Sequence, residues 1–360
     1  MQYATPEKIF IRQLLRSIRR RDIPEDLSYL TVLKFARLGF SPIEVARYEL
    51  DRNQLGSHYL SELDSLRLQE RSRSPLDSII HDKLTFHCAL SAVSDLVCKF
   101  HGLIIRGNYL PWPIRDSSSH MLDHLRNLLT NTPLVLKPRF GSMKRGLTIV
   151  EEGPSGTVFV NKVREPRPIE EVIGRHSLSV VTEYAQQAAY AEAIAPGWSG
   201  PIRVLTVRNR DNRPVMVSAS HQFSTRLSST SPGDEQRSIR AGVDVLSGEM
   251  LAALGIGNRQ RLVSYSSHPD TGSQIRGSQV PNWPRIRQDL ELAHARLPLV
   301  ESVSWDVVIT DSGPRVLEAE RALSPRLFQW HSPLLLNQTF VDFAVRHGVS
   351  SGQHDPRQSK

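Results

Sequence analysis

The sequence contains only two cysteines, Cys88 and Cys98, among its 360 residues. They stand ten positions apart in a stretch that we expect to form one helix, which separates them by about 15 Å along the helix axis. That distance is too long for a disulfide bond. We therefore expect two buried, unpaired thiols.

Long apolar runs are also missing. No run approaches the roughly 18 residues of a membrane-spanning helix. The first residues, MQYATPEKIFIRQLLR, contain no uninterrupted apolar segment of the signal-peptide type. We therefore expect no membrane span and a cytoplasmic protein.

Neither disorder nor a fibrous class is favoured, because 39% of the residues are hydrophobic and 23% are charged. A chain of this length predicts two or three domains. The net charge of +8 suits an anionic partner such as a nucleotide, a nucleic acid or phospholipid head groups. The one dense basic run, Arg19 to Arg21, fits a solvated helix face or a nucleic-acid contact. Nucleic acid is the less favoured partner, since no motif combines basic and aromatic residues.

Helices are predicted in the first 75 residues, where apolar positions recur at helical spacing. One of these helices opens with Ser41 as its cap, Pro42 in its first turn and Glu44 three residues after the cap. A second, amphipathic helix is predicted from Asp82 along DKLTFHCALSAVSDLVCKFHG, with Gly102 after its end. A strand at HGLIIRG should follow it.

The character then changes to short β-rich runs separated by Gly, Pro, Asn and Asp. These runs are LVLKP, LTIVEE, TVFVNKV, LSVVTEY, IRVLTVRN, PVMVSAS, SVSWDVVIT and RVLEAE. Helices are predicted near 119–129, 284–297 and 341–347, and the polar tail after residue 349 is expected to be disordered. Helices and strands in separate stretches indicate an α+β fold and not a parallel wound sheet.

The stretch PLVLKPRFGSMKRGLTIV, residues 133–150, nearly matches a phosphate-binding loop. Gly141 and Gly146 are spaced as in G-x-x-x-x-G-K-[ST], but Leu147 occupies the lysine position. A P-loop also needs a helix directly after it, whereas LTIVEE is typical of a strand. We therefore expect a glycine flap over phosphates, with Lys137 projecting from the preceding strand. The alternative is a surface hairpin with a basic tip.

Two strands joined by a turn are predicted for SVSWDVVITDSGPRVLEAE, residues 302–320. The turn Asp311-Ser312-Gly313 suits a three-residue loop whose glycine takes a positive φ. That register pairs Thr310 with Pro314.

The same register places Asp306 opposite Glu318, with Glu320 on the same face, while Trp305 points to the other face. Like charges across a sheet repel one another unless a cation lies between them. Magnesium prefers such hard oxygen ligands. We interpret the three carboxylates as a magnesium site; the alternative is an exposed acidic strand face.

A strand lysine, a glycine flap, a Glu-Tyr strand end and an Asp…Glu-x-Glu hairpin follow one another in this order. This arrangement is similar to the ATP-grasp superfamily. More narrowly, IRVLTVRN, SHPDTGSQIRGSQVPNW and WDVVITDSGPRVLEAE resemble its sugar-transfer-associated branch, which is found with bacterial surface-polysaccharide genes. The resemblance runs from about Ser57 to Gly348.

The resemblance implies an ATP-grasp fold, in which two α+β subdomains clasp ATP, with magnesium as a second cofactor. Arg203 would face the transferring phosphoryl group or the substrate carboxylate, and Arg203 and Lys137 are the implied catalytic residues. The residues implied for ATP are Lys83, Lys137, Gly141, Ser142, Lys144, Gly146, Glu183, Tyr184 and Glu192. Those implied for the metal are Asp306, Glu318 and Glu320.

The usual chemistry of the superfamily joins a carboxylic acid to an amine through an acyl phosphate. The resemblance therefore implies an ADP-forming carboxylate-amine ligase that acts on a sugar, amino-acid or peptide precursor, in surface-polysaccharide or related biosynthesis. The sequence names neither the acid nor the amine, and it leaves the oligomeric state open. The alternative function is a non-catalytic nucleotide-binding protein with the same fold.

Two departures from the pattern stand out. The metal motif of the family usually ends in Glu-x-Asn, where this chain has Glu318-Ala319-Glu320. The middle stretch SSTSPGDEQRSIRAGVDVLSG lacks the expected asparagine and paired glycines. The expected domains are a helical extension over 1–75, an entry segment over 76–130, a small subdomain over 131–190, a large subdomain over 191–349 and a tail over 350–360.

Overall fold

The computed structural model describes residues 5–19, 23–24, 26–53, 55–92, 94–113, 121–140, 146–197, 200–226, 238–321 and 325–349. The chain forms two compact units, and each is built from segments far apart in the sequence. Unit 1 comprises Met1–Asp77, Ala189–Val307 and Glu320–Lys360, and unit 2 comprises Ser78–Ala188 and Val308–Ala319.

The first sheet lies in unit 2 and has seven strands in the order β2-β1-β7-β3-β4-β5-β6. Its neighbouring strands are antiparallel. The strands are β1 (Phe100–Ile105), β2 (Asn108–Pro111), β3 (Leu134–Pro138), β4 (Thr148–Glu152), β5 (Thr157–Val160), β6 (Val163–Pro168) and β7 (Leu178–Glu183). A core of buried side chains from β1, β3, β4 and β7 packs against α7 (Met121–Leu129) and α8 (Ile169–Gly174).

The second sheet also has seven strands, in the order β12-β11-β10-β9-β8-β13-β14. They are β8 (Ile202–Arg208), β9 (Pro214–Ser224), β10 (Ser238–Val243), β11 (Met250–Ile256), β12 (Leu262–Tyr265), β13 (Ser302–Thr310) and β14 (Gly313–Glu320). The pairs from β12 to β13 are antiparallel. The division between the units falls within β13 and β14. Two mostly antiparallel sheets with separate helices confirm the predicted α+β class.

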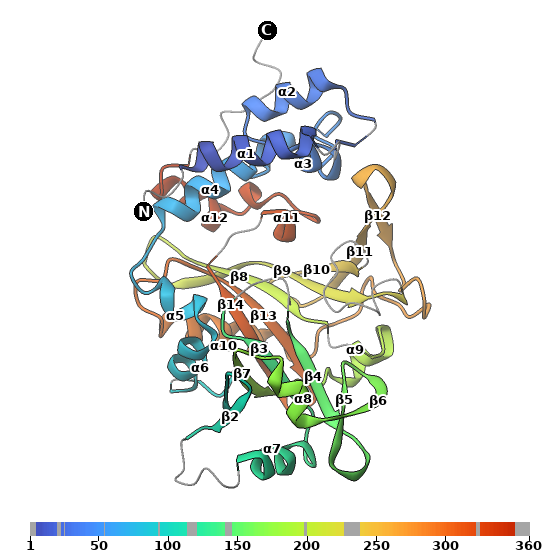
Figure 1. Cartoon of the computed structure of the whole chain (residues 1–360). Helices are drawn as coiled ribbons and strands as arrows, with labels where there is room; N and C mark the ends of the chain where they lie inside the picture. Colours follow the sequence, from blue (N-terminus) through green and yellow to red (C-terminus); the bar gives the residue numbers. More distant parts are fainter. Residues whose placement is uncertain are drawn as a thin grey trace. The chain divides into compact units, whose positions relative to one another are not determined.

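Helices cover the part of the second sheet that lies in unit 1. Figure 1 shows a layer of α4, α11 and α12 next to the sheet, with α1, α2 and α3 beyond it. These helices are α1 (Pro6–Arg19), α2 (Tyr29–Arg37), α3 (Pro42–Arg47), α4 (Glu62–Arg71), α11 (Pro325–Phe328) and α12 (Gln338–Arg346). The remaining α-helices are α5 (Asp77–His81), α6 (Lys83–Ser91), α9 (Ala189–Ile194) and α10 (Trp283–Ala295). Within the described residues, none of the helices has the length and apolar character needed to cross a membrane.

The predicted start of α3 is confirmed. Pro42 opens the helix, and one carboxyl oxygen of Glu44 accepts hydrogen bonds from the backbone N–H and the hydroxyl of Ser41, at 2.9 and 3.1 Å. Glu44 itself is fully buried. This capping residue therefore lies inside the protein.

The helix predicted between Asp82 and Gly102 is wrong in its second half, because α6 ends at Ser91. Leu96 and Cys98 hydrogen-bond instead to the backbone of Val316 in β14, and Val93 lies outside the described residues. Gly102 is not a helix end but part of β1, where a Cβ would come within 2.2 Å of the Leu110 carbonyl oxygen. Pairing with distant strands outweighs the local helical pattern here.

Three smaller predictions also need correction. Only one of the two cysteines is buried, because Cys98 is enclosed whereas Cys88 is exposed. The single strand predicted over TVFVNKV is the hairpin β5–β6, which turns at Asn161 and Lys162, both with positive φ. The turn between β13 and β14 is one residue shorter than predicted, although Gly313 has the predicted positive φ of 116°.

Candidate functional site

Two of the predicted phosphate-binding lysines meet at β14 within unit 2. The Lys137 ammonium, on the buried strand β3, donates to the backbone carbonyl of Leu317 at 3.1 Å. The Lys83 ammonium lies 3.6 Å from a carboxylate oxygen of Glu318. Residues 54 positions apart in the sequence thus place two cations beside one strand that carries a predicted metal ligand.

An ion pair that the sequence did not predict fixes the position of Lys83. Asp82 caps α6 by accepting from the Leu84 N–H at 3.1 Å, and Arg139 donates to both of its oxygens at 2.8 and 2.5 Å. These hydrogen bonds lower the pKa of Asp82 to about 2, with the Arg139 bond as the largest cause. Because Arg139 follows β3 closely, the pair ties the first turn of α6 to the strand that carries Lys137.

His87 lies close enough to Lys137 and Lys83 for their positive charges to affect its pKa. Its ring is buried in α6, and neither ring nitrogen has a hydrogen-bond partner among the described residues. Burial, followed by the charges of Lys137 and Lys83, lowers the pKa of His87 to about 3. The imidazole is therefore neutral at physiological pH, and the cationic surroundings favour an anion.

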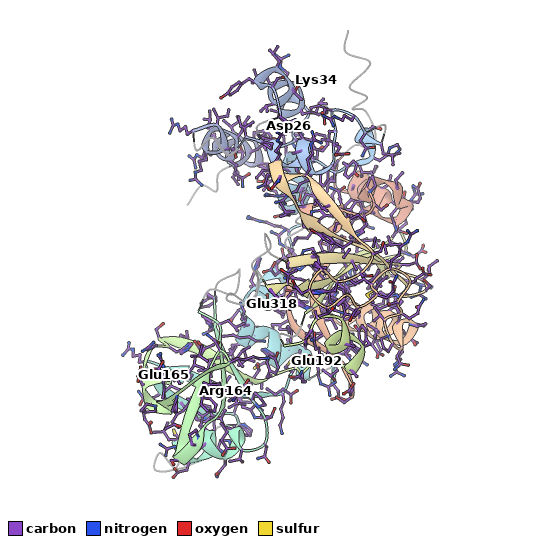
Figure 2. The ribbon with its side chains drawn as sticks, turned by 90° about the vertical axis from the view of Figure 1, so that its right-hand side faces the viewer. Asp26, Lys34, Arg164, Glu165, Glu192 and Glu318 are labelled. Carbon is purple, nitrogen blue, oxygen red and sulfur yellow. The ribbon has the colours of Figure 1, made fainter. Side chains whose placement is uncertain are left out.

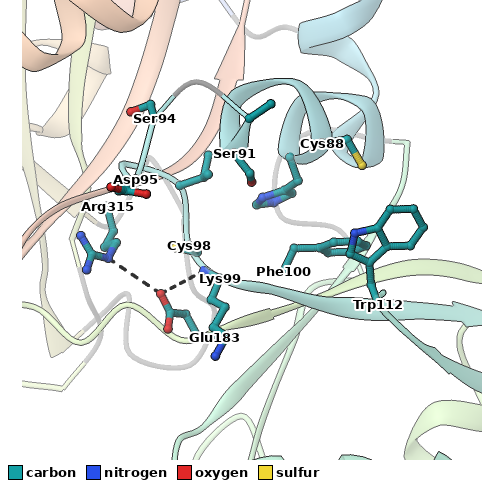
Figure 3. Close-up of a pocket in the computed structure, with 13 residues that line it drawn as sticks. Cys88, Ser91, Ser94, Asp95, Cys98, Lys99, Phe100, Trp112, Glu183 and Arg315 are labelled. Atoms are coloured by element: carbon teal, nitrogen blue, oxygen red, sulfur yellow. Dashed lines mark hydrogen bonds and ion pairs between the residues drawn. The ribbon is translucent and has the colours of Figure 1, made fainter. Parts of the chain in front are cut away.

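Glu183, predicted to bind adenine, lies at the end of β7 and is held on two sides (Figure 3). Its carboxylate accepts from the Lys99 backbone N–H at 3.0 Å and lies 3.8 Å from the Arg315 guanidinium. The Tyr184 ring is next to it in sequence and has the Lys162 ammonium 6.0 Å from its centroid. Glu183 therefore stands between a cation and a backbone donor at the end of a buried strand.

A pocket of about 620 Å³ opens beside Glu183 within unit 2. One part of its wall is aromatic, because His87 stacks on Phe100 with ring centroids 5.9 Å apart and Phe100 contacts Trp112. The polar part includes Glu183 and Arg315 (Figure 3). The lining is mixed, because Ser91, Ser94, Asp95 and Lys99 also contribute to it. A volume of this size lies within the range of small-molecule sites.

The predicted flap is only partly described. Gly141, Ser142 and Lys144 lie outside the described residues. Gly146 lies just before β4 with φ of 75°, and a Cβ there would approach the Pro138 ring at 3.0 Å. Glycine is thus required at the end of the flap by its backbone conformation and by the close strand.

A profile of the family described as sugar-transfer associated ATP-grasp matches residues 73–332, which is more than half of the chain. The chain belongs to this ATP-grasp family. The match includes both lysines, Glu183 and the β13–β14 hairpin. The recognition made from the sequence is therefore confirmed.

Several solved structures are similar to the ATP-grasp chain at low identity. L-amino acid ligase from Bacillus licheniformis is 9% identical with a TM-score of 0.42, over 78% of this chain and 50% of its own. D-alanine–D-alanine ligase from Bacillus anthracis is 15% identical with a TM-score of 0.38, over 75% and 69%. N5-carboxyaminoimidazole synthetase from Staphylococcus aureus, complexed with ADP, is 10% identical with a TM-score of 0.37, over 68% and 45%.

The ATP-grasp chain spans about half the length of two of these proteins, the amino acid ligase and the carboxyaminoimidazole synthetase. No curated protein sequence matches it. The family assignment therefore rests on the match over residues 73–332.

In unit 1, the predicted catalytic residue Arg203 pairs with the predicted metal ligand Asp306. The two lie directly opposite each other on β8 and β13, and two guanidinium nitrogens each donate to one carboxylate oxygen at 2.6 Å. Glu192, on α9, accepts from the Gly197 backbone N–H at 3.0 Å. Asp306 is buried although it carries a carboxylate, because both faces of β13 are covered.

Two of the three carboxylates predicted for the metal already face a cation. Asp306 faces Arg203, and Glu318 faces Lys83. Within the described residues, no three His, Cys, Asp or Glu side chains gather closely enough to hold a metal ion. The magnesium site over Asp306, Glu318 and Glu320 stays a prediction.

Sequence reasoning missed four residues at this site: His87, Lys99, Arg139 and Arg315. His87 and Arg139 had a local signal, because each follows a predicted lysine at short range. Lys99 and Arg315 had none, since they meet at Glu183 only through the pairing of β1 with β7 and the bridge between Val97 and Val316 of β14.

Proposed function

We propose that this ATP-grasp protein binds ATP and uses it to join a carboxylic acid to an amine, with release of ADP and phosphate. The observation that carries the proposal is the meeting of Lys83 and Lys137 at β14, next to Glu318. The two ammonium groups would bind phosphate oxygens of ATP. The carboxylates on the same strand would bind the cation that accompanies the polyphosphate. The cytoplasmic location and the polysaccharide context remain part of the proposal.

The chemistry has two steps. A substrate carboxylate oxygen attacks the γ-phosphorus, so an O–P bond forms as the bond to the ADP oxygen breaks. The amine nitrogen then attacks the acyl carbon, the C–N bond forms, phosphate leaves and the nitrogen loses a proton to solvent. Neither step needs a protein nucleophile, because positioning and charge neutralisation supply most of the catalysis.

The residues of unit 2 have distinct roles in this proposal. Lys137 and Lys83 bind phosphate oxygens and reduce the repulsion between the attacking carboxylate and the nucleotide. Glu183 accepts a hydrogen bond from the base, for which the neighbouring pocket offers an aromatic wall. Binding would replace the present contact of Lys137 with the Leu317 carbonyl, since an ammonium gains more from phosphate than from a neutral oxygen.

The residues of the β13–β14 hairpin fit magnesium by the chemistry of their donors, which are carboxylate oxygens. Asp306, Glu318 and Glu320 would hold the ion, and bound magnesium would supply positive charge to the phosphates. Arg203 would orient the substrate carboxylate or the γ-phosphate once Asp306 also binds the magnesium ion. The acid is proposed to come from a sugar, an amino acid or a peptide precursor.

The decisive experiment is an ADP-release screen with ATP, magnesium and pooled amino acids and uronic acids, with products followed by mass spectrometry. We expect release of ADP that depends on one pooled acid and one amine, with a new amide in the products. Nucleotide binding without release of ADP in any pool would reject the ligase and favour the non-catalytic alternative. The absence of any nucleotide binding would reject both functions.

A further inference from the structure

The first two helices of unit 1 expose large apolar side chains. On α1, Ile11 and Leu15 are 52% and 48% exposed and stand one turn apart. On α2, Tyr29, Leu30 and Leu33 are 68%, 79% and 53% exposed. Single apolar side chains are common on protein surfaces, but several together on two neighbouring helices mark an interaction site.

These apolar side chains are not part of the core that forms the helices. The buried side chains are Pro6 and Phe10 of α1 and Val32 and Phe35 of α2. Val32 and Phe35 lie in one apolar cluster, and Leu14 of α1 packs against it. The two helices thus share one core, and the exposed residues point away from it.

Basic side chains border both apolar stripes. Lys8, Arg12, Arg16 and Arg19 lie on the exposed side of α1, and Lys34 and Arg37 lie on the exposed side of α2. Lys34 extends from α2 on the side turned away from the sheet of this unit (Figure 2). The single acidic residue of α1, Glu7, is paired with Arg67 of α4 at 3.0 Å, and α2 contains none. The exposed face of both helices is therefore strongly cationic.

We propose that α1 and α2 together form a docking surface for an anionic phospholipid membrane. Helices that lie in the membrane interface combine apolar side chains that enter the acyl boundary with a basic border that contacts anionic head groups. Tyr29 adds an amphipathic ring, which is favoured at that depth. A nucleic acid would use the cations but would leave Leu30 and Leu33 in water.

The proposed surface is independent of the ligase function. It lies on the helices before residue 73, where the match to the ATP-grasp family begins. Together with the lack of a spanning helix in the described part of the chain, it points to peripheral and reversible binding. An enzyme that docks in this way would act on substrates at the membrane surface.

The test is co-sedimentation of the full chain with two kinds of vesicle. One contains phosphatidylcholine alone, and the other contains phosphatidylcholine with phosphatidylglycerol. We expect binding to the anionic vesicles only, and binding that weakens as salt is raised. The double variant Leu30→Ser/Leu33→Ser should bind at least about tenfold more weakly. The double variant Arg12→Gln/Arg16→Gln should lose affinity and also show a smaller dependence on salt.

Matched controls come from the same unit. Leu246 and Leu292 are 70% and 49% exposed, so Leu246→Ser/Leu292→Ser removes two similar side chains outside the proposed surface. This control should bind as the wild type does. Circular dichroism and thermal melting verify that each variant is folded. If Leu30→Ser/Leu33→Ser does not fold, Arg12→Gln/Arg16→Gln tests the proposal by itself.

Three results would overturn the proposal. One is the absence of wild-type binding to the anionic vesicles. Another is an equal loss in the control and in the surface variants. The third is a wild-type dimer in sedimentation equilibrium that Leu30→Ser/Leu33→Ser converts to monomer without change in vesicle binding, which would assign the surface to a second copy of the chain.

Discussion

Arg203 and Asp306 stand directly opposite each other on neighbouring strands and form a bidentate ion pair with both N–O distances at 2.6 Å. Their side chains are 19% and 7% exposed, so water screens the pair only weakly. The family resemblance implied that Arg203 faces the phosphoryl group or the substrate carboxylate and that Asp306 binds the metal. In the structure they neutralise each other, and any ligand of either residue competes with this pair.

Breaking this pair should destabilise the protein. Asp306→Asn removes the negative partner of a guanidinium that is largely buried, so we expect the free energy of unfolding to fall by roughly 3–5 kcal/mol. Urea denaturation of Asp306→Asn, Arg203→Met and the double variant gives the coupling energy. We expect a coupling of about 1–3 kcal/mol. A coupling near zero would show that the pair does not contribute to stability.

Lys137→Met should weaken nucleotide binding without unfolding the protein. Methionine keeps an apolar stem of similar size in a position that is 6% exposed, but it removes the ammonium. Loss of a charge-assisted hydrogen bond of about 1.5–3 kcal/mol predicts at least roughly tenfold weaker ATP binding by calorimetry. Lys34→Met, on the exposed face of α2, is the control and should bind normally. Equal ATP affinities of Lys137→Met and Lys34→Met would show that the phosphate site does not lie at β3.

Glu320 tests the departure from the metal motif of the family. Glu320→Asn keeps an oxygen ligand and removes one negative charge, so we expect turnover to survive but to need a higher magnesium concentration. Glu318→Ala and Asp306→Ala should both abolish turnover. Magnesium titrations of ADP release measure the whole series. If the wild type is inactive and Glu320→Asn gains turnover, Glu320 prevents catalysis and the natural protein is a nucleotide-binding protein without ligase activity.

Glu44 should make the stability of unit 1 depend on pH. Burial, and then the nearby Glu62 carboxylate, raise the pKa of Glu44 from its usual 4.5 to about 8. The folded protein therefore holds a proton that the unfolded chain releases, and stability should be greatest below pH 4.5 and should decrease as the pH rises to about 8. Glu44→Gln should flatten this decrease in urea denaturation. Glu70→Gln, at an exposed position of α4, should leave the slope unchanged.

Local patterns in the sequence determined much of the fold. Short β-rich runs identified β3, β7 and β13, and the Ser41 cap identified the start of α3. The strand pattern also led to the prediction of Lys137 and of the hairpin carboxylates, because a strand fixes the face of each side chain within a few residues. Glycine at position 313 was required by its positive φ, which is also a local property.

The tertiary structure alone decided which strands are neighbours. Arg203 meets Asp306, 103 residues later, because β8 lies beside β13. The segment at Leu96 and Cys98 pairs with Val316 and so ends a helix that its own pattern favoured. It also joins residues 308–319 to the unit formed by residues 78–188. Such lateral pairing depends on burial and hydrogen bonds between distant segments, and a short stretch of sequence encodes only its own half of each pair.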